Sequence, residues 1–110
     1  MIPQPGDVVV CYFLGAEGRK WRPSVVVSTD AYHARGSDVI VGEITRQLTK
    51  ANTPMDYLLQ DWAAASLHQP SAFRVYFSME LMSRIRLIGH LSDRDWQEVQ
   101  ARLRLGLAVT

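Results

Sequence analysis

The sequence predicts a mainly β fold with one helix: a small, strongly bent barrel of short strands against which a C-terminal amphipathic helix packs. Two observations predict it. Several short apolar runs, rich in β-branched and aromatic residues, recur at near-regular spacing along the chain. One segment close to the C-terminus carries apolar residues at helical spacing instead. Many short strands closed by a single helix are typical of small barrels.

The first three strands are expected at 8–14, 24–28 and 38–45. The run at 8–14 reads VVVCYFL, which is too short for a typical helix and has the composition of a buried strand. Between the first two strands, the glycines and cations of 15–20 predict a flexible polar loop. A second connection is expected at 32–37.

The second half of the chain predicts a short strand at 56–59 and two longer strands at 71–77 and 85–91. Residues of alternating polarity in the last two runs are typical of half-buried strands. The alanine-rich segment 61–66 begins with an acidic residue and predicts one helical turn.

Ser92 begins the only strong helix. Ser92 and Asp95 have the spacing of a capping box, in which the serine hydroxyl accepts a hydrogen bond at the helix N-terminus. The apolar stripe recurs at helical spacing in Trp96, Val99, Leu103 and Leu107. Asp95 lies off that stripe, so we expect it to face water together with the other charged residues of the helix.

Length and composition predict one globular domain over residues 1–110. The chain has 12 Lys and Arg against 11 Asp and Glu, and 47% of its residues are hydrophobic. This is ordinary for a folded protein and excludes wholesale disorder. The near-zero charge excludes a histone-like basic protein but leaves room for a local basic groove. The chain has neither an apolar run of the ~20 residues that a membrane span needs nor a signal peptide, and its single cysteine, Cys11, favours the reducing cytoplasm.

Several kinds of site are not predicted. The three histidines, His33, His68 and His90, lie far apart with no partner at metal-ligand spacing, so no metal is expected. Cys11 lies inside an apolar strand, where a thiol is usually inert. The sequence has no Gly-x-Ser-x-Gly elbow and no phosphate-binding Gly-x-x-x-x-Gly-Lys loop, and no cofactor is expected.

A group of cations surrounds one aromatic residue. Arg19, Lys20 and Arg22 flank Trp21, and Arg46 and Arg74 follow in later strands. Guanidinium groups bind phosphate with two hydrogen bonds and an indole stacks on a base, so the group suits nucleic acid. Cations beside a glycine-containing loop also occur on ordinary solvated surfaces, and composition alone leaves both interpretations open.

The order of the motifs along the chain adds a resemblance. In order, the motifs are Pro5-Gly6-Asp7, Arg22-Pro23-Ser24-Val25-Val26-Val27-Ser28, Val39-Ile40-Val41-Gly42-Glu43-Ile44-Thr45, Leu67-His68-Gln69-Pro70-Ser71 and Gly89-His90-Leu91-Ser92-Asp93. Together they resemble the MazF/PemK family of type II toxin–antitoxin toxins, including its PemK/Kid-like members. The resemblance covers the chain from Pro5 to about Leu105.

The resemblance implies an SH3-like barrel of the CcdB/MazF/PemK type with a C-terminal helix. It further implies a cytoplasmic toxin that is held inactive by a cognate antitoxin, forms a homodimer and has no membrane partner. Its activity would be that of a metal-independent, sequence-selective endoribonuclease, an mRNA interferase. It would cleave single-stranded RNA through the 2′-hydroxyl of the substrate and would need no cofactor.

Matched residue by residue, the resemblance implies that Arg22 and Thr45 are catalytic. A fixed guanidinium at Arg22 would stabilise the negative charge that develops on a pentacovalent phosphorus, and the Thr45 hydroxyl would position a phosphate oxygen. Arg74 is the third catalytic candidate. It lies where PemK/Kid-like members carry an Arg-x-Asp pair, but Tyr76 replaces the aspartate here.

Because a phenol is a poor base at neutral pH, the tyrosine at this position leaves the identity of the general base undecided. Glu43, Glu17, His33 and a water molecule are the candidates. The residues expected to contact RNA are Arg19, Lys20, Trp21, Arg46 and Tyr76.

Three alternatives remain at this point. A CcdB-like gyrase poison would share the fold but inhibit DNA supercoiling and leave RNA intact. A non-catalytic RNA-binding barrel would bind RNA without cleaving it, and a protein-binding SH3-like module would need an aromatic groove. The Arg-Pro and Ile-Thr strands, in the family's order, favour the ribonuclease.

Overall fold

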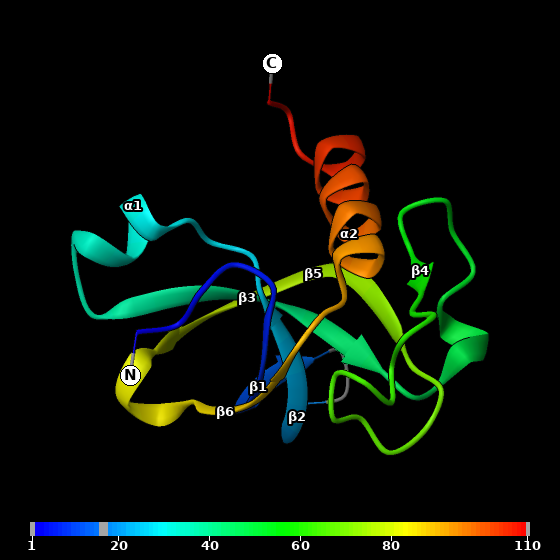
Figure 1. Cartoon of the computed structure of the whole chain (residues 1–110), viewed down its shortest axis with the longest axis horizontal. Coiled ribbons are helices and arrows are strands. Elements are labelled where there is room, and N and C mark those ends of the chain that lie inside the picture. Colours follow the sequence, from blue (N-terminus) through cyan, green and yellow to red (C-terminus); the bar gives the residue numbers. More distant parts are fainter. Residues whose placement is uncertain (1, 16–17, 110) are drawn as a thin grey trace.

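The computed structural model describes residues 2–15 and 18–109. Six strands form one antiparallel sheet in the order β4-β5-β3-β2-β1-β6. The strands are β1 (Asp7–Gly15), β2 (Gly18–Val26), β3 (Asp38–Thr45), β4 (Tyr57–Leu58), β5 (Ala72–Leu81) and β6 (Arg86–His90). The helices are α1 (Asp30–Ala34) and α2 (Asp93–Gly106), with short 3-10 turns η1 (Leu48–Lys50) and η2 (Met82–Arg84). The sheet curls into a half-barrel with α2 at one end, which confirms the predicted fold (Figure 1).

Two irregularities in register accompany the curvature of the sheet. The pairing of β1 with β6 shifts between Val8 and Val9, and that of β3 with β5 shifts between Gly42 and Glu43. Such bulges increase the local twist of a strand. At the second bulge a Cβ on Gly42 would come within 2.5 Å of the Phe73 ring, so only glycine lets that ring lie against β3.

Strand β1 is buried on both faces, and this explains its unbroken apolar run. Val8 packs into a first core cluster together with Phe73 of β5 and Val99 of α2. Its neighbour Val9 packs into a second cluster on the other face of the sheet, with Phe13. Successive side chains of a strand point to opposite faces, so a strand between two cores has no polar alternation.

Three local expectations differ from the structure. Strand β2 begins at Gly18, which pairs with Gly15, so Arg19 and Lys20 lie in a strand rather than in a loop. Helix α1 overlaps the connection expected at 32–37, and the hydroxyl of Thr29 caps it. The 61–66 segment forms turns instead of a helical turn, and it ends at Ser66, whose φ of 69° is left-handed.

Asp95 corrects the expectation that it faces water. Ser92 caps α2 as predicted, accepting a hydrogen bond from the Asp95 backbone N–H at 3.3 Å. The Asp95 side chain, however, is 0% exposed. Its oxygens accept hydrogen bonds from the Tyr57 hydroxyl at 2.6 Å and from the backbone N–H groups of Gln60 and Asp61 at 3.0 and 2.8 Å. The helix therefore begins against the chain that follows β4, and helical spacing alone does not reveal this contact.

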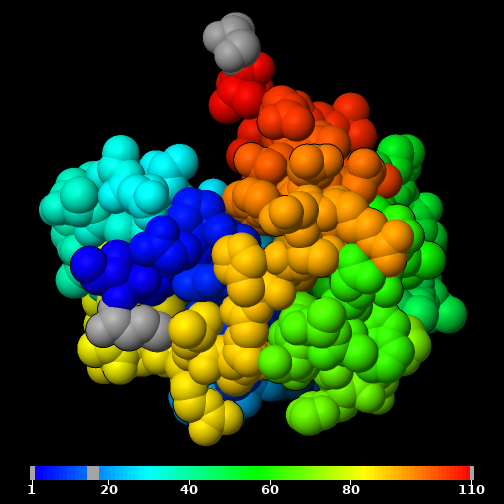
Figure 2. Space-filling view, viewed as in Figure 1, coloured from blue at the N-terminus to red at the C-terminus, as the bar shows by residue number. Residues whose placement is uncertain are grey.

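A second carboxylate strengthens the same junction. Asp61 accepts hydrogen bonds from the Ser92 hydroxyl at 2.6 Å and from two nitrogens of Arg94 at 2.7 and 2.6 Å. The hydrogen bonds from Arg94, more than the one from Ser92, lower the pKa of Asp61 to about 2. Burial, and then the hydrogen bond to Asp95, raises the pKa of Tyr57 to about 12. Figure 2 shows the start of α2 and the segment after β4 packed side by side.

No helix within 2–15 and 18–109 is long and apolar enough to cross a membrane.

Replacing Asp95 by alanine should destabilise the fold by about 3 kcal/mol. The change leaves a buried hydroxyl and two backbone N–H groups without their acceptor, and each such group costs about 1–3 kcal/mol. Urea unfolding followed by tryptophan fluorescence measures the loss. Asp93→Ala is the matched control: Asp93 is exposed in the same first turn, so its loss should cost under about 1 kcal/mol. Equal losses in the two variants would contradict the anchoring role of Asp95.

Asp61 should contribute stability above about pH 4 and lose it as the pH falls toward about 2. Its folded-state pKa is lowered from 3.8 to about 2, so the unfolded chain takes up the proton first as acid is added. The difference in melting temperature between the native chain and Asp61→Asn should therefore be constant at neutral pH and shrink across that interval. If the difference in melting temperature does not change with pH, protonation of the Asp61 carboxylate is not coupled to unfolding.

Candidate functional site

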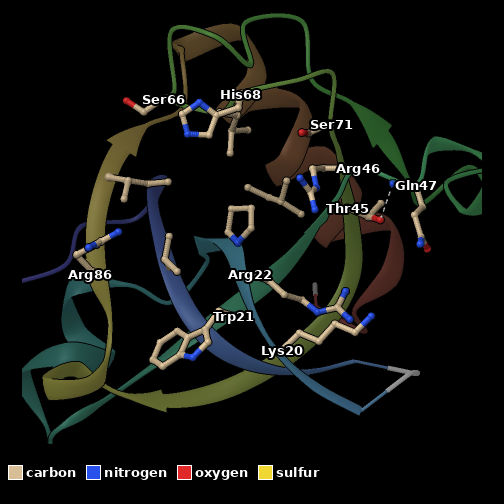
Figure 3. A pocket seen from close by; sticks show the side chains of 15 residues that line it. Lys20, Trp21, Arg22, Thr45, Arg46, Gln47, Ser66, His68, Ser71 and Arg86 are labelled. Carbon is tan, nitrogen blue, oxygen red and sulfur yellow. Dashed lines mark hydrogen bonds between the residues drawn. The ribbon is translucent and has the colours of Figure 1, made fainter.

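A cavity of about 570 Å³ opens where β2, the end of β3, β6 and the chain before β5 meet. Figure 3 shows it from close by. Lys20, Trp21 and Arg22 of β2 form one end, and Ser66 and His68 lie at the other. Thr45, Arg46 and Gln47 line one side, with Arg86 of β6 on the other. The cavity therefore joins residues that are far apart in the sequence.

The lining of the cavity is strongly cationic. Lys20, Arg22, Arg46 and Arg86 all contribute to it. No aspartate or glutamate is among the residues that line it within the described chain. Like charges collected in a concave surface focus a positive potential, which attracts a polyanion.

Arg22 is held in place by a buried carboxylate behind the cavity. Its Nη1 donates to Glu43 Oε1 at 3.1 Å, and its side chain is 16% exposed. The two residues come together because Ser24, two residues after Arg22, pairs with Glu43 across β2 and β3. The Nε of Arg22 is buried, and no hydrogen-bond partner for it lies in the described part of the chain. Glu43 thus fixes the guanidinium in orientation, and the part of the side chain that remains exposed lines the cavity.

Thr45 ends β3 at the edge of the cavity. Its hydroxyl oxygen accepts a hydrogen bond from the backbone N–H of Gln47 at 3.1 Å, and the residue is buried. The accepted hydrogen bond orients the oxygen and leaves the hydroxyl hydrogen to be donated to a ligand. Arg22 and Thr45, predicted as a catalytic pair, both line this cavity.

Trp21 stands at the rim, with 68% of its surface exposed. Its indole packs against Tyr12, its cross-strand partner, with ring centroids 5.5 Å apart. Arg19 supports the pair by donating from Nη1 to the Tyr12 carbonyl oxygen at 3.1 Å. The indole is thus an exposed aromatic surface held beside the cations. Arg19 itself does not line the cavity.

Two other predicted residues lie on β5, away from the cavity lining. Arg74 is the cross-strand partner of Glu43, and its Nε donates to Asp56 Oδ1 at 3.4 Å. Tyr76 packs against Phe13 of the second core cluster, with ring centroids 6.0 Å apart. Glu43 therefore lies between Arg22 and the strand position of Arg74.

The three residues considered as general base differ in their positions. The Glu43 carboxylate accepts the hydrogen bond from Arg22. His33 is 5% exposed and its Nε2 lies 2.6 Å from the Ser28 hydroxyl, so it ties α1 to the end of β2 rather than lining the cavity. Glu17 lies outside the described residues.

Sequence reasoning missed part of the lining: Gln47, Ser66, His68, Ser71 and Arg86. The alternation of polar and apolar residues in 85–91 was a signal that Arg86 projects from one face of a strand. His68 lies in one of the motifs that carry the resemblance, but the motif assigned it no role, and it reaches the cavity because of how its loop is folded.

The loop that carries Ser66 and His68 is fixed at several points. The Leu67 side chain is buried in the first core cluster. The Ser71 hydroxyl donates to the Gln69 carbonyl oxygen at 2.8 Å. On the β6 side, a Cβ on Gly89 would meet the carbonyl oxygen of Ala65 at 2.4 Å. The loop backbone therefore packs against Gly89 at a distance that leaves no room for a side chain.

The model of one protein family matches residues 4–107. That family is described as the PemK-like, MazF-like toxin of type II toxin–antitoxin systems. No curated protein sequence gives a significant match.

Solved structures share the fold at low sequence identity. A MazE–MazF complex from Deinococcus radiodurans has a TM-score of 0.73 at 19% identity, covering 100% of this chain and 99% of that one. An endoribonuclease in complex with its cognate antitoxin from a mycobacterial species has a TM-score of 0.74 at 18% identity, covering 98% and 99%. A mycobacterial endoribonuclease has a TM-score of 0.74 at 17% identity, covering 100% and 97%.

Gly89→Ala should disturb the cavity as well as the fold. The new methyl group meets backbone atoms that cannot move alone, so the 63–68 loop must shift or the protein must lose about 1–3 kcal/mol of stability. Thermal unfolding measures the stability. Quenching of Trp21 fluorescence by added oligonucleotide measures binding at the cavity. Gly36→Ala is the control, because its nearest contact would be an ordinary 3.8 Å. A Gly89→Ala protein with native stability would show that the contact is not tight.

Proposed function

Because this chain belongs to the PemK-like, MazF-like toxin family of type II toxin–antitoxin systems, we propose that it is an endoribonuclease that cleaves single-stranded RNA at the cavity of Arg22 and Thr45. The proposal covers the reaction, the site residues and the independence from metal ions.

One observation carries the proposal. The cavity collects four permanent cations with no lining carboxylate in the described chain, and at one end it holds a guanidinium fixed by a buried partner. A ligand with repeated negative charges suits such a lining better than a neutral peptide does. Trp21 at the rim adds a surface on which an unpaired base stacks, and this favours a single strand over a duplex.

The reaction proposed uses a nucleophile that RNA itself carries. The 2′-hydroxyl oxygen attacks the adjacent phosphorus, the bond to the 5′-oxygen breaks, and the products end in a 2′,3′-cyclic phosphate and a 5′-hydroxyl. Negative charge accumulates on the non-bridging oxygens in the transition state. The Arg22 guanidinium, which lines the cavity, would hydrogen-bond to one of them, and the Thr45 hydroxyl would donate to the other.

The remaining cations hold the strand. Lys20 and Arg46 flank the proposed catalytic pair and would contact neighbouring phosphates, while Arg86 faces them across the cavity. No step of this scheme assigns a role to a metal ion, so we propose that cleavage proceeds in the presence of a chelator.

Two partners complete the proposal. A cognate antitoxin would block the cavity with an acidic segment, because carboxylates compete for the same cations. A second copy of the chain would cover the apolar groove between β5 and α2, which is lined by Phe77, Met79, Leu103 and Leu107. Met79 and Leu107 are exposed apolar side chains in the single chain.

Arg22→Lys should lower the cleavage rate by about 100-fold or more while the protein stays folded. Lysine keeps a positive charge beside Glu43 but loses the planar donor group. Thr45→Val, which removes only the hydroxyl, should cost a similar factor. Cleavage of an unstructured RNA in EDTA is measured on sequencing gels, with thermal unfolding as a check of the fold.

The matched control is Arg35→Lys, because Arg35 is exposed, pairs with Asp38 and lies outside the cavity lining. It should cleave at the native rate. Native activity in Arg22→Lys and Thr45→Val would move the active site elsewhere, and intact RNA with the native protein would reject the ribonuclease activity itself.

A further inference from the structure

We propose that His68 is the general base of the reaction, accepting the proton of the RNA 2′-hydroxyl. The inference rests on the proposed ribonuclease function and names the group that the sequence left open. His68 was not among the sequence-predicted candidates, and its position in the fold is what brings it forward.

The composition of the cavity lining singles out this residue. A general base at neutral pH must give up and take back a proton there, and an imidazole does so in its ordinary range. The other charged groups of the lining, Lys20, Arg22, Arg46 and Arg86, are cations throughout that range. His68 is the remaining side chain of the described lining that can switch between charged and neutral forms.

The imidazole of His68 is available for this role. The residue is exposed, and neither ring nitrogen has a hydrogen bond to the described chain. The other two histidines are already engaged: Nε2 of His33 lies 2.6 Å from the Ser28 hydroxyl, and Nδ1 of His90 lies 2.8 Å from Asp7 Oδ1. Neither of them lines the cavity.

The loop holds His68 in place although its side chain is exposed. Buried Leu67 precedes it, and two residues after it Pro70 restricts the backbone. At the other end of the loop, Ser71 is buried and bonded back to Gln69. Because the backbone of His68 is already fixed, less conformational entropy is lost when a bound substrate orders its side chain.

The position of His68 fits the geometry of an in-line displacement. The attacking and leaving oxygens lie on opposite sides of the phosphorus, so the groups that serve them must face each other across the phosphate. Figure 3 shows His68 and Arg22 toward opposite ends of the cavity. A phosphate held by Arg22 and Thr45 therefore presents its far side to the imidazole.

The step balances as follows. The neutral imidazole takes the 2′-hydroxyl proton while the 2′-oxygen forms its bond to phosphorus. The electron pair of the breaking bond goes to the 5′-oxygen, which takes a proton from water. The imidazolium then returns its proton to solvent.

The test compares His68→Gln with the native protein in single-turnover cleavage of a fluorescent oligoribonucleotide that the native protein cuts. Glutamine keeps hydrogen-bonding capacity but cannot take the proton. We expect a rate lower by about 100-fold to 10,000-fold. We also expect the cleavage rate of His68→Gln to depend less on pH than that of the native protein. The affinity for the same oligonucleotide with 2′-O-methyl groups, which cannot react, should change by less than about threefold.

His90→Gln is the matched control, a histidine outside the cavity that should keep the native rate and pH profile. Restoration of His68→Ala by added imidazole would support the proposal. Three results would overturn it: a native pH profile in His68→Gln, a fall in affinity equal to the fall in rate, or full rescue of His68→Gln by a substrate with sulfur at the leaving 5′-position, which would make His68 the acid instead. A native protein that cleaves no RNA at all would overturn the proposed function, a result distinct from these three.

Discussion

A carboxylate with no exposed surface, that of Asp95, joins helix α2 to the chain after β4. It accepts hydrogen bonds from the Tyr57 hydroxyl and from two backbone N–H groups, so three donors stabilise the buried carboxylate. Asp61, held by Ser92 and Arg94, closes the same junction from outside. These contacts fix where the chain leaves β4, and the loop that continues from there forms one wall of the cavity. The helix that covers the first core therefore also sets the position of a site it does not touch.

The charges of the sheet form ion pairs behind the cavity and a group of cations around it. Behind the cavity, Glu43 pairs with Arg22 and Asp56 with Arg74, and these pairs are half-buried or buried. Within the cavity, the cations have no carboxylate facing them among the lining residues described. Like charges gathered in this way repel one another, and the repulsion is relieved when an anion binds. The sheet thus orients one guanidinium with a buried acid and gathers the other cations around the same cavity.

The cavity has two kinds of wall. Strands β2 and β3 supply permanent cations and a hydroxyl whose positions follow from strand pairing. The loop before β5 supplies an imidazole, whose charge depends on pH. A phosphodiester transfer needs both: fixed donors for the charge that develops, and a group that gains and loses a proton. A tight contact between Gly89 and Ala65 fixes this loop against β6, which pairs with β1.

Patterning along the chain determined the number of strands, their sequence along the chain and the start of α2 at Ser92, because these depend on local propensity. The proposed pair of Arg22 and Thr45 came from the resemblance to a family, and the structure brings both residues to one cavity. It failed for β2, whose first residues looked like a loop because Arg19 and Lys20 are polar on an exposed hairpin. It failed for Asp95, because a polar residue off the apolar stripe is buried only where another segment brings donors to it. Only the tertiary structure placed His68 and Arg86 in the same cavity as Arg22 and kept Arg74 and His33 out of its lining. Which residues share a cavity depends on how distant segments fold back on one another, and local sequence does not encode that.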